Sequence, residues 1–96
     1  MEIKSNVNGE ETVMELSGWL DTQTAPEFKE AIDGIDNTTS SLVLDLKDLE
    51  YISSAGLRQL VAAHKKMKGN LTICNVSKEI LDILRMAGFD KRLNIK

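Results

Sequence analysis

Two serines stand side by side in the segment YISSAGLRQL, which covers residues 51–60 and runs into a predicted helix. A serine hydroxyl can act as a nucleophile, cap a helix or accept a phosphate group. Nucleophilic catalysis needs a base within hydrogen-bond reach, and the only histidine is His64. At 1.5 Å per residue, His64 would lie about 15 Å along the helix from Ser54. We therefore expect no serine-based catalysis, and the chain is not expected to be an enzyme.

Residues for other chemistries do not form their usual patterns. The sequence contains no phosphate-binding G-x-x-x-x-G-K-[ST] or G-x-G-x-x-G motif. Asp45, Asp48 and Glu50 do not follow a calcium-loop pattern, so we interpret them as solvated loop carboxylates. The single cysteine, Cys74, excludes an intramolecular disulfide and a cysteine-cluster metal site, and its apolar neighbours indicate a buried, inert thiol. We expect no metal and no cofactor.

The two adjacent serines can be explained in two ways. Ser54 is expected at or near the N-cap of the helix, where a serine stabilises by about 1 kcal/mol relative to alanine. One cap needs only one hydroxyl, however. The start of a helix also presents unpaired amides and the positive end of the helix dipole, which suit an added phosphate. From the residues alone, a structural cap and a phosphorylation switch both remain open.

Periodicity and turn residues predict the elements before these serines. Asn8-Gly9 is typical of a tight hairpin, and 12–20 reads as the strand that follows it. The segment 24–27, TAPE, has the spacing of a capping box, in which the Thr hydroxyl accepts from an amide of the first turn. The helix that starts there should end at Gly34.

The remaining elements alternate between strand and helix. The apolar run at 42–46 predicts a strand buried on both faces. The helix after the serines carries apolar residues at helical spacing, and a strand at 71–76, a helix at 77–88 and a weak strand at 93–95 follow. The order β-β-α-β-α-β-α predicts an α/β fold. Its mixed sheet of four or five strands should be covered by helices and paired in parallel after the hairpin.

Composition and charge restrict the class of protein. The 96 residues, 42% of them hydrophobic, suffice for a single domain over 1–96. A net charge of −3 from mixed signs argues against a nucleic-acid partner. The N-terminus has no signal-peptide pattern, and no apolar stretch approaches the roughly 20 residues that span a bilayer. We expect an intracellular, cytoplasmic protein without membrane insertion.

Two blocks of the sequence resemble one protein family. LSGWLD at 16–21 with TA at 24–25 is similar to the block "L-x-G-x-L-D-x-x-T-A". LDL at 44–46 followed by YISSAGL at 51–57 is similar to "D-L-x-x-L-x-[YF]-[IM]-[DS]-S-[SA]-G-L". The blocks occur in order, at family-like separations, and the expected element order agrees over nearly the whole chain. The chain therefore resembles the STAS domain of bacterial anti-sigma-factor antagonists.

This resemblance implies partner switching. Such antagonists bind an anti-sigma factor that is also a serine kinase of the GHKL ATPase type, and binding frees the sigma factor for transcription. The kinase phosphorylates a serine at the start of the second helix and so releases the antagonist, and a PP2C-type phosphatase reverses the step. Alignment of Ser-Ala-Gly-Leu implies Ser54 as the phosphoacceptor. The residues implied to meet the partner are Asp21, Thr22, Ser53, Ser54, Ala55, Gly56, Leu57 and Arg58.

The sequence departs from the family pattern at two positions. Ser53 stands where the family often has Asp, and it is a rival phosphate acceptor. Arg58 stands where the family often has a small residue, and it can pair with a phosphate on Ser54 or simply face solvent. Asp21 matches a family position whose loop should lie near Ser54, where a turn role and a partner contact are both open.

Other functions remain to be weighed. A STAS domain can dock a partner in a stress-signalling scaffold or a lipid-transport complex without phosphorylation. A nucleotide sensor is a different class, against which the missing glycine-rich phosphate loop counts. A hydrolase is the weakest alternative, because no base is in reach of the serines.

Overall fold

The computed structural model describes residues 1–96 and begins with the expected hairpin. β1 (Glu2–Asn8) and β2 (Glu11–Leu20) pair antiparallel around a two-residue turn of Gly9 and Glu10. The turn is confirmed, one residue later than its Asn-Gly signal. Gly9 has a φ of +62°, a conformation that glycine adopts without strain.

Parallel strands follow the hairpin, as predicted. β3 (Ser41–Ile52) pairs with β2, β4 (Leu71–Cys74) with β3, and β5 (Asn94–Ile95) with β4, so the sheet order follows the chain. The connections contain α1 (Ala25–Asp33), α2 (Ser54–Lys66) and α3 (Lys78–Met86). The α/β class and the short terminal strand are confirmed. None of the three helices is long and apolar enough to cross a membrane.

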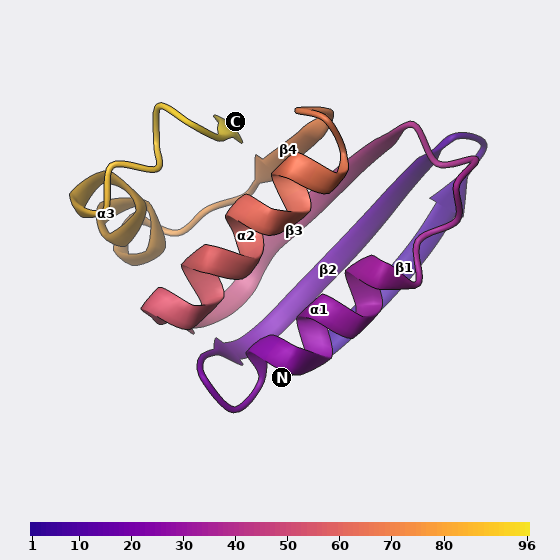
Figure 1. Ribbon diagram of the computed structural model, residues 1–96. Coiled ribbons are helices and arrows are strands. Elements are labelled where there is room, and N and C mark those ends of the chain that lie inside the picture. Colours follow the sequence, from indigo (N-terminus) through magenta and orange to yellow (C-terminus); the bar gives the residue numbers. More distant parts are fainter.

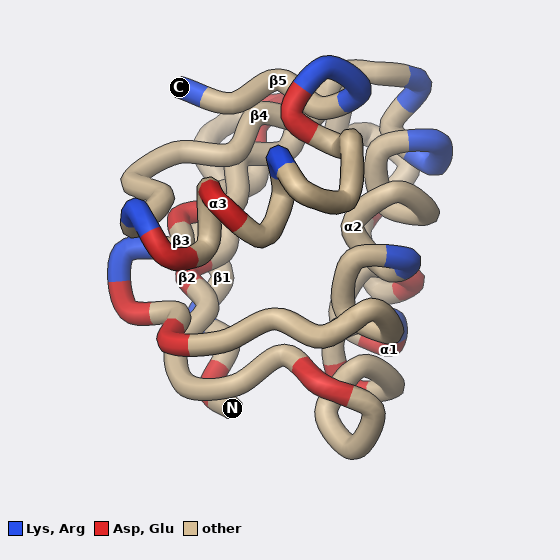
Figure 2. Tube along the Cα trace, turned by 90° about the vertical axis from the view of Figure 1, so that its left-hand side faces the viewer, with Lys and Arg blue, Asp and Glu red and all other residues tan.

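The helices and one face of the sheet enclose a single core. α1 and α2 lie on the same side of the sheet, and α3 lies beyond α2 and contacts β3 (Figures 1 and 2). Phe28 of α1, Leu60 of α2 and Leu84 of α3 are each fully buried in one cluster with Leu44 of β3. Because each new strand is added on the same side of the previous one, right-handed crossovers place every helix on the same face.

The opposite face of the sheet is open, which corrects the prediction that 42–46 is buried on both faces. Leu42, Leu44 and Leu46 are buried, but Val43 and Asp45 between them are only half-buried. The apolar run suggested burial on both faces because Val43 is apolar, although Val43 lies on the outer face of the sheet. An alternating burial pattern is expected for a sheet that is covered on one side only.

β3 is longer and less regular than predicted. It has 12 residues against 10 in β2, and its pairing with β2 shifts register at two places, near Ser17 and near Trp19. Such bulges insert extra residues and bend a strand. Asp45, Asp48 and Glu50 therefore lie within β3 and not in a loop, which corrects their interpretation; Asp48 and Glu50 are exposed, as expected.

Gly56 tests how tightly α2 packs against the end of β2. A Cβ there would lie 2.7 Å from the carbonyl oxygen of Leu20 and 2.8 Å from Ile52 Cγ1. We expect Gly56→Ala to lower the free energy of unfolding by about 1–3 kcal/mol, because the close contact must be relieved by displacing the helix. Chemical denaturation monitored by circular dichroism measures the change.

Gly34→Ala is the matched control. A Cβ at Gly34 would remain 3.5 Å from the nearest atom, the carbonyl oxygen of Glu30, and the φ of Gly34 is −81°. Its free energy of unfolding should stay constant or rise by about 0.4–1 kcal/mol. Equal losses in both variants would contradict the packing described for Gly56.

Candidate functional site

The carboxyl ends of β2 and β3 and the start of α2 meet at one end of the sheet (Figure 1). Leu20 and Ile52 are register partners, and the Ser53 amide donates a hydrogen bond of 2.9 Å to the carbonyl oxygen of Leu20. The loop that starts at Asp21 therefore adjoins the two serines, as the resemblance implies.

Ser53, and not Ser54, caps α2. Ser53 has extended dihedral angles (φ −95°, ψ 176°), and its Oγ accepts from the amide of Gly56 at 3.4 Å. The prediction that Ser54 caps the helix is wrong, and the prediction that Ser54 accepts a phosphate stays a prediction. The physical reason is that the Ser53 amide is bound to the end of β2, so that helical geometry begins only at the next residue.

Ser54 is the first residue of α2 and is exposed, and its hydroxyl makes no hydrogen bond within the chain. The first turn of α2 contains no acidic residue, whereas Glu27 and Glu79 occupy the first turns of α1 and α3. The last turn of α2 is basic, and it lies in the upper part of Figure 2. The positive end of the helix dipole at Ser54 is therefore uncompensated and favours an added negative charge.

Asp21 shapes the loop beside Ser53. Its Oδ1 accepts from the amides of Gln23 at 3.0 Å and Thr24 at 3.1 Å. The Thr24 hydroxyl donates to the carbonyl oxygen of Trp19 at 2.7 Å and accepts from the Asp21 amide at 2.9 Å. Thr24 makes no side-chain cap bond to α1, so the predicted capping box is wrong. A turn role for Asp21 is present in the structure.

The other implied partner residues differ in exposure. Thr22 is exposed in the loop after β2. Arg58 is exposed, makes no ion pair and lies in the second turn of α2, four residues after Ser54. Gly56 and Leu57 are buried, so they position the helix and offer little surface to a partner.

An aromatic pair lies on the open face at the same end of the sheet. Trp19 and Tyr51 are register partners in β2 and β3, with ring centroids 5.2 Å apart and ring planes at 51°. Their exposed fractions are 56% and 40%. Their pairing depends on the bulges of β3 and has no signal in the local sequence.

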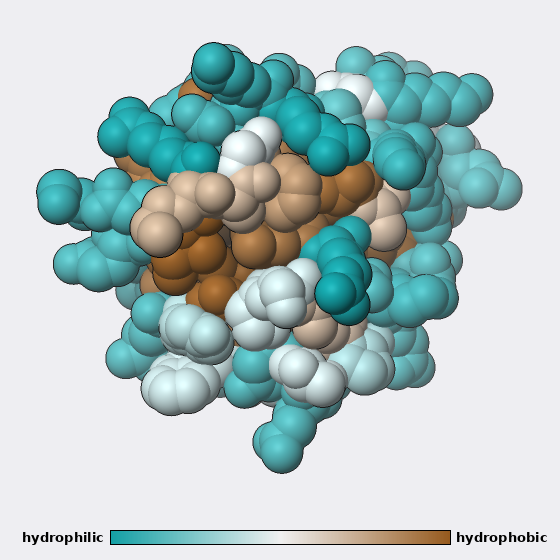
Figure 3. All heavy atoms as spheres, turned by 60° about the vertical axis from the view of Figure 1, so that its left-hand side comes forward, coloured by the Kyte–Doolittle hydropathy of each residue, from teal (hydrophilic) through white to brown (hydrophobic).

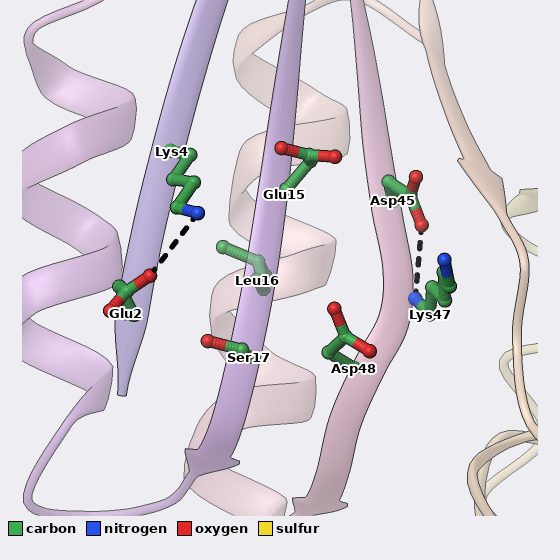
Figure 4. A pocket seen from close by; sticks show the side chains of 8 residues that line it. All are labelled: Glu2, Lys4, Glu15, Leu16, Ser17, Asp45, Lys47 and Asp48. Atoms are coloured by element: carbon green, nitrogen blue, oxygen red, sulfur yellow. Dashed lines mark hydrogen bonds and ion pairs between the residues drawn. The ribbon is translucent and has the colours of Figure 1, made fainter.

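A shallow, charged cavity of about 130 Å³ lies on the same open face (Figure 4). Lys4 forms an ion pair of 3.6 Å with Glu2, and the Lys47 amide donates to Asp45 at 3.0 Å. No three side chains of His, Cys, Asp or Glu converge in a geometry that could hold a metal ion. The residues that line the cavity are Glu2, Lys4, Glu15, Leu16, Ser17, Asp45, Lys47 and Asp48.

Cys74 lies near the open face and is half-buried, so it is less enclosed than its sequence context predicted. Burial raises the pKa of its thiol, and the charge of nearby Asp45 raises the pKa further. Both effects disfavour the thiolate, which is the reactive form. The expected inertness therefore has a physical basis even though the burial is incomplete.

Figure 3 shows the side of the molecule on which α3 and the start of α2 lie. Apolar side chains gather at the centre of this face and are ringed by hydrophilic ones. Ile83 of α3 and Phe89 after it are only partly buried against the core. These two side chains therefore leave some apolar area exposed at and after α3.

Comparison with known proteins defines the family. The model of the STAS domain matches residues 1–96, so the chain belongs to the STAS domain family. The anti-sigma-B factor antagonist of Bacillus subtilis is 26% identical over 98 residues, which cover 99% of this chain and 88% of that protein. The crystal structure of an anti-sigma factor antagonist from Mycobacterium paratuberculosis superimposes with a TM-score of 0.87 at 24% identity, covering 98% of this chain and 83% of that one.

Another structural neighbour has been solved in two states. The anti-sigma factor antagonist SpoIIAA in its unphosphorylated form has a TM-score of 0.76 to this chain at 14% identity, covering 99% of this chain and 87% of that one. The phosphorylated form of SpoIIAA from Bacillus gives 0.75 at 15% identity, covering 99% and 91%. SpoIIAA therefore has this fold in both forms.

Substitution of each serine separates their two roles. We expect Ser53→Ala to lower the free energy of unfolding by about 1 kcal/mol, because α2 loses its only side-chain cap bond. Ser54→Ala should change it by less than about 0.5 kcal/mol, because an exposed hydroxyl without partners is removed. Urea denaturation of both variants makes the comparison, and a larger loss from Ser54→Ala would contradict the cap assignment.

Proposed function

We propose that this chain is an anti-sigma-factor antagonist that is switched off by phosphorylation of Ser54. Membership of the STAS family and full-length similarity to an anti-sigma-B factor antagonist support the antagonist role. The observation that carries the site is the exposed, unbonded hydroxyl at the first position of α2. In this role the chain is a substrate and a binding partner, not an enzyme, and it acts in the cytoplasm on sigma-factor-dependent transcription.

The neighbouring serine is the poorer acceptor on structural grounds. The Ser53 hydroxyl is half-buried and accepts the cap bond from Gly56, so a phosphate there would displace that bond. Ser54 Oγ is free to enter the active site of a GHKL-type kinase. That kinase would remove the hydroxyl proton while Ser54 Oγ bonds to the γ-phosphorus of ATP and ADP leaves. A PP2C-type phosphatase would hydrolyse the ester and restore the hydroxyl.

The phosphate should act at the interface with the anti-sigma factor and leave the fold intact. The start of α2 favours an anion, and no acidic residue of the first turn opposes it. The two forms of SpoIIAA, with nearly equal TM-scores to this chain, support the same view. A phosphate adds a charge of about −1.5 to −2, and its desolvation in a packed contact easily costs several kcal/mol. A loss of about 3 kcal/mol already weakens binding more than a hundredfold.

The acceptor is tested with purified kinases. Each GHKL-type serine kinase encoded in the same genome is incubated with this protein, ATP and Mg²⁺, and the intact mass is measured. We expect one of them to add one phosphate to the wild type and to Ser53→Ala, and none to Ser54→Ala. If Ser53→Ala loses the phosphate and Ser54→Ala keeps it, Ser53 is the acceptor. No phosphate with any kinase would contradict the switch itself.

The positive end of the α2 dipole leads to a second prediction. Ser54→Glu should raise the free energy of unfolding by about 0.3–1 kcal/mol at low salt, because the carboxylate compensates the helix dipole. Added salt should reduce the gain. Ser54→Gln is the matched neutral control, and thermal denaturation at two ionic strengths measures all three proteins. Destabilisation by Glu relative to Gln would contradict the proposed accommodation of phosphate.

A further inference from the structure

We propose that the open face of the sheet is a second part of the partner-binding surface, where Trp19 and Tyr51 anchor a basic segment of the anti-sigma factor. This inference rests on the proposed function and deepens it, because it concerns how the same partner is held. The proposed contact lies on the face opposite the helices and needs no phosphate.

The aromatic pair is unusual on this surface. Only four large hydrophobic side chains are strongly exposed, and two of them, Trp19 and Tyr51, stand together. The other two, Val7 at 67% and Met86 at 90%, lie in β1 and at the end of α3. Trp and Tyr are enriched among the residues that dominate interface affinity. The Trp19–Tyr51 pair is therefore the strongest candidate anchor on the chain.

Carboxylates without an ion-pair partner lie on the same open face as the aromatic pair. The cavity of Figure 4 is lined by four carboxylates and two lysines, and the only ion pair among them joins Lys4 and Glu2. Asp48 is the register partner of Ser17, and Ser17 lies two residues before Trp19 in the chain. Asp48 has no ion-pair partner. Cations bind both aromatic faces and carboxylates. The chemistry that fits this face is therefore an arginine or lysine side chain of the partner.

One partner can reach this face and Ser54 together. Tyr51 precedes Ser54 by three residues, so their Cα atoms lie within about 11 Å of each other. A standard interface covers about 800 Å² on each protein, which is ample to include both positions. The loop after Leu20 lies between the two surfaces, because Trp19 comes just before it and the Ser53 amide donates to the carbonyl oxygen of Leu20, the last residue of β2.

The test measures binding to the kinase that phosphorylates Ser54, with ATP and Mg²⁺ omitted. Titration calorimetry should show at least about tenfold weaker binding for Trp19→Ala. Asp48→Asn should bind several-fold more weakly at low salt, with a smaller salt dependence than the wild type. Met86→Ala removes an even more exposed side chain elsewhere and should bind as the wild type does. Trp19 is the only tryptophan, so its fluorescence should also change on wild-type binding.

The outcomes separate this inference from the proposed function. If the kinase phosphorylates the wild type and binds Trp19→Ala and Asp48→Asn with unchanged affinity, the inference fails and the proposed function stands. If no kinase binds or phosphorylates the wild type, both fail. Circular dichroism checks the fold of each variant, and Tyr51→Ala replaces Trp19→Ala if the latter is unfolded. If sedimentation shows that Trp19→Ala abolishes a homodimer and leaves kinase binding intact, the face binds a second copy, which also overturns the inference.

Discussion

The hydrogen bond from the Ser53 amide to the carbonyl oxygen of Leu20 fixes where β3 ends and where α2 can begin. It holds Ser53 in an extended conformation, so its side chain turns back to cap the helix. Gly56 then has to pass within contact distance of the same carbonyl, and only a residue without a Cβ fits there. The position of Ser54 follows from these contacts, since the next residue is the first with free helical geometry.

These contacts give the two adjacent hydroxyls different roles. Ser53 serves the fold, whereas Ser54 is left exposed at the positive end of a helix that lacks a first-turn acid. A modification at Ser54 can therefore change the charge of the surface without removing a bond that the fold needs. In the proposed switch the base and the ATP are supplied by a second protein, the kinase, and this agrees with the full-length similarity to an anti-sigma-B factor antagonist.

The order of the elements could be predicted because it depends on local signals. Apolar spacing, the hairpin glycine and the terminal glycines of the helices each act within a few residues. The errors involve contacts with residues outside each local motif. Thr24 has the right spacing for a capping box, but its hydroxyl is taken by the carbonyl of Trp19. Val43 belongs to an apolar run, yet its burial depends on which face the helices cover.

The candidate site could be predicted only in part, because some of its features depend on contacts outside the local motif. The family motif pointed to the two serines and to a neighbouring Asp21 loop, and the structure does bring that loop beside them, but the choice of cap depended on a bond to β2. The Trp19–Tyr51 pair could not be found in the sequence, because two bulges in β3 decide which residues face each other. Register is a tertiary property wherever a strand carries bulges.

The most direct test compares one protein in two states. Purified protein with phosphoserine installed at position 54 and the unmodified protein are titrated with the anti-sigma factor, and their circular dichroism spectra are recorded. We expect at least about a hundredfold weaker binding of the phosphorylated form with an unchanged spectrum. Equal affinities, or a loss of affinity that accompanies a loss of structure, would contradict a switch that acts at the interface.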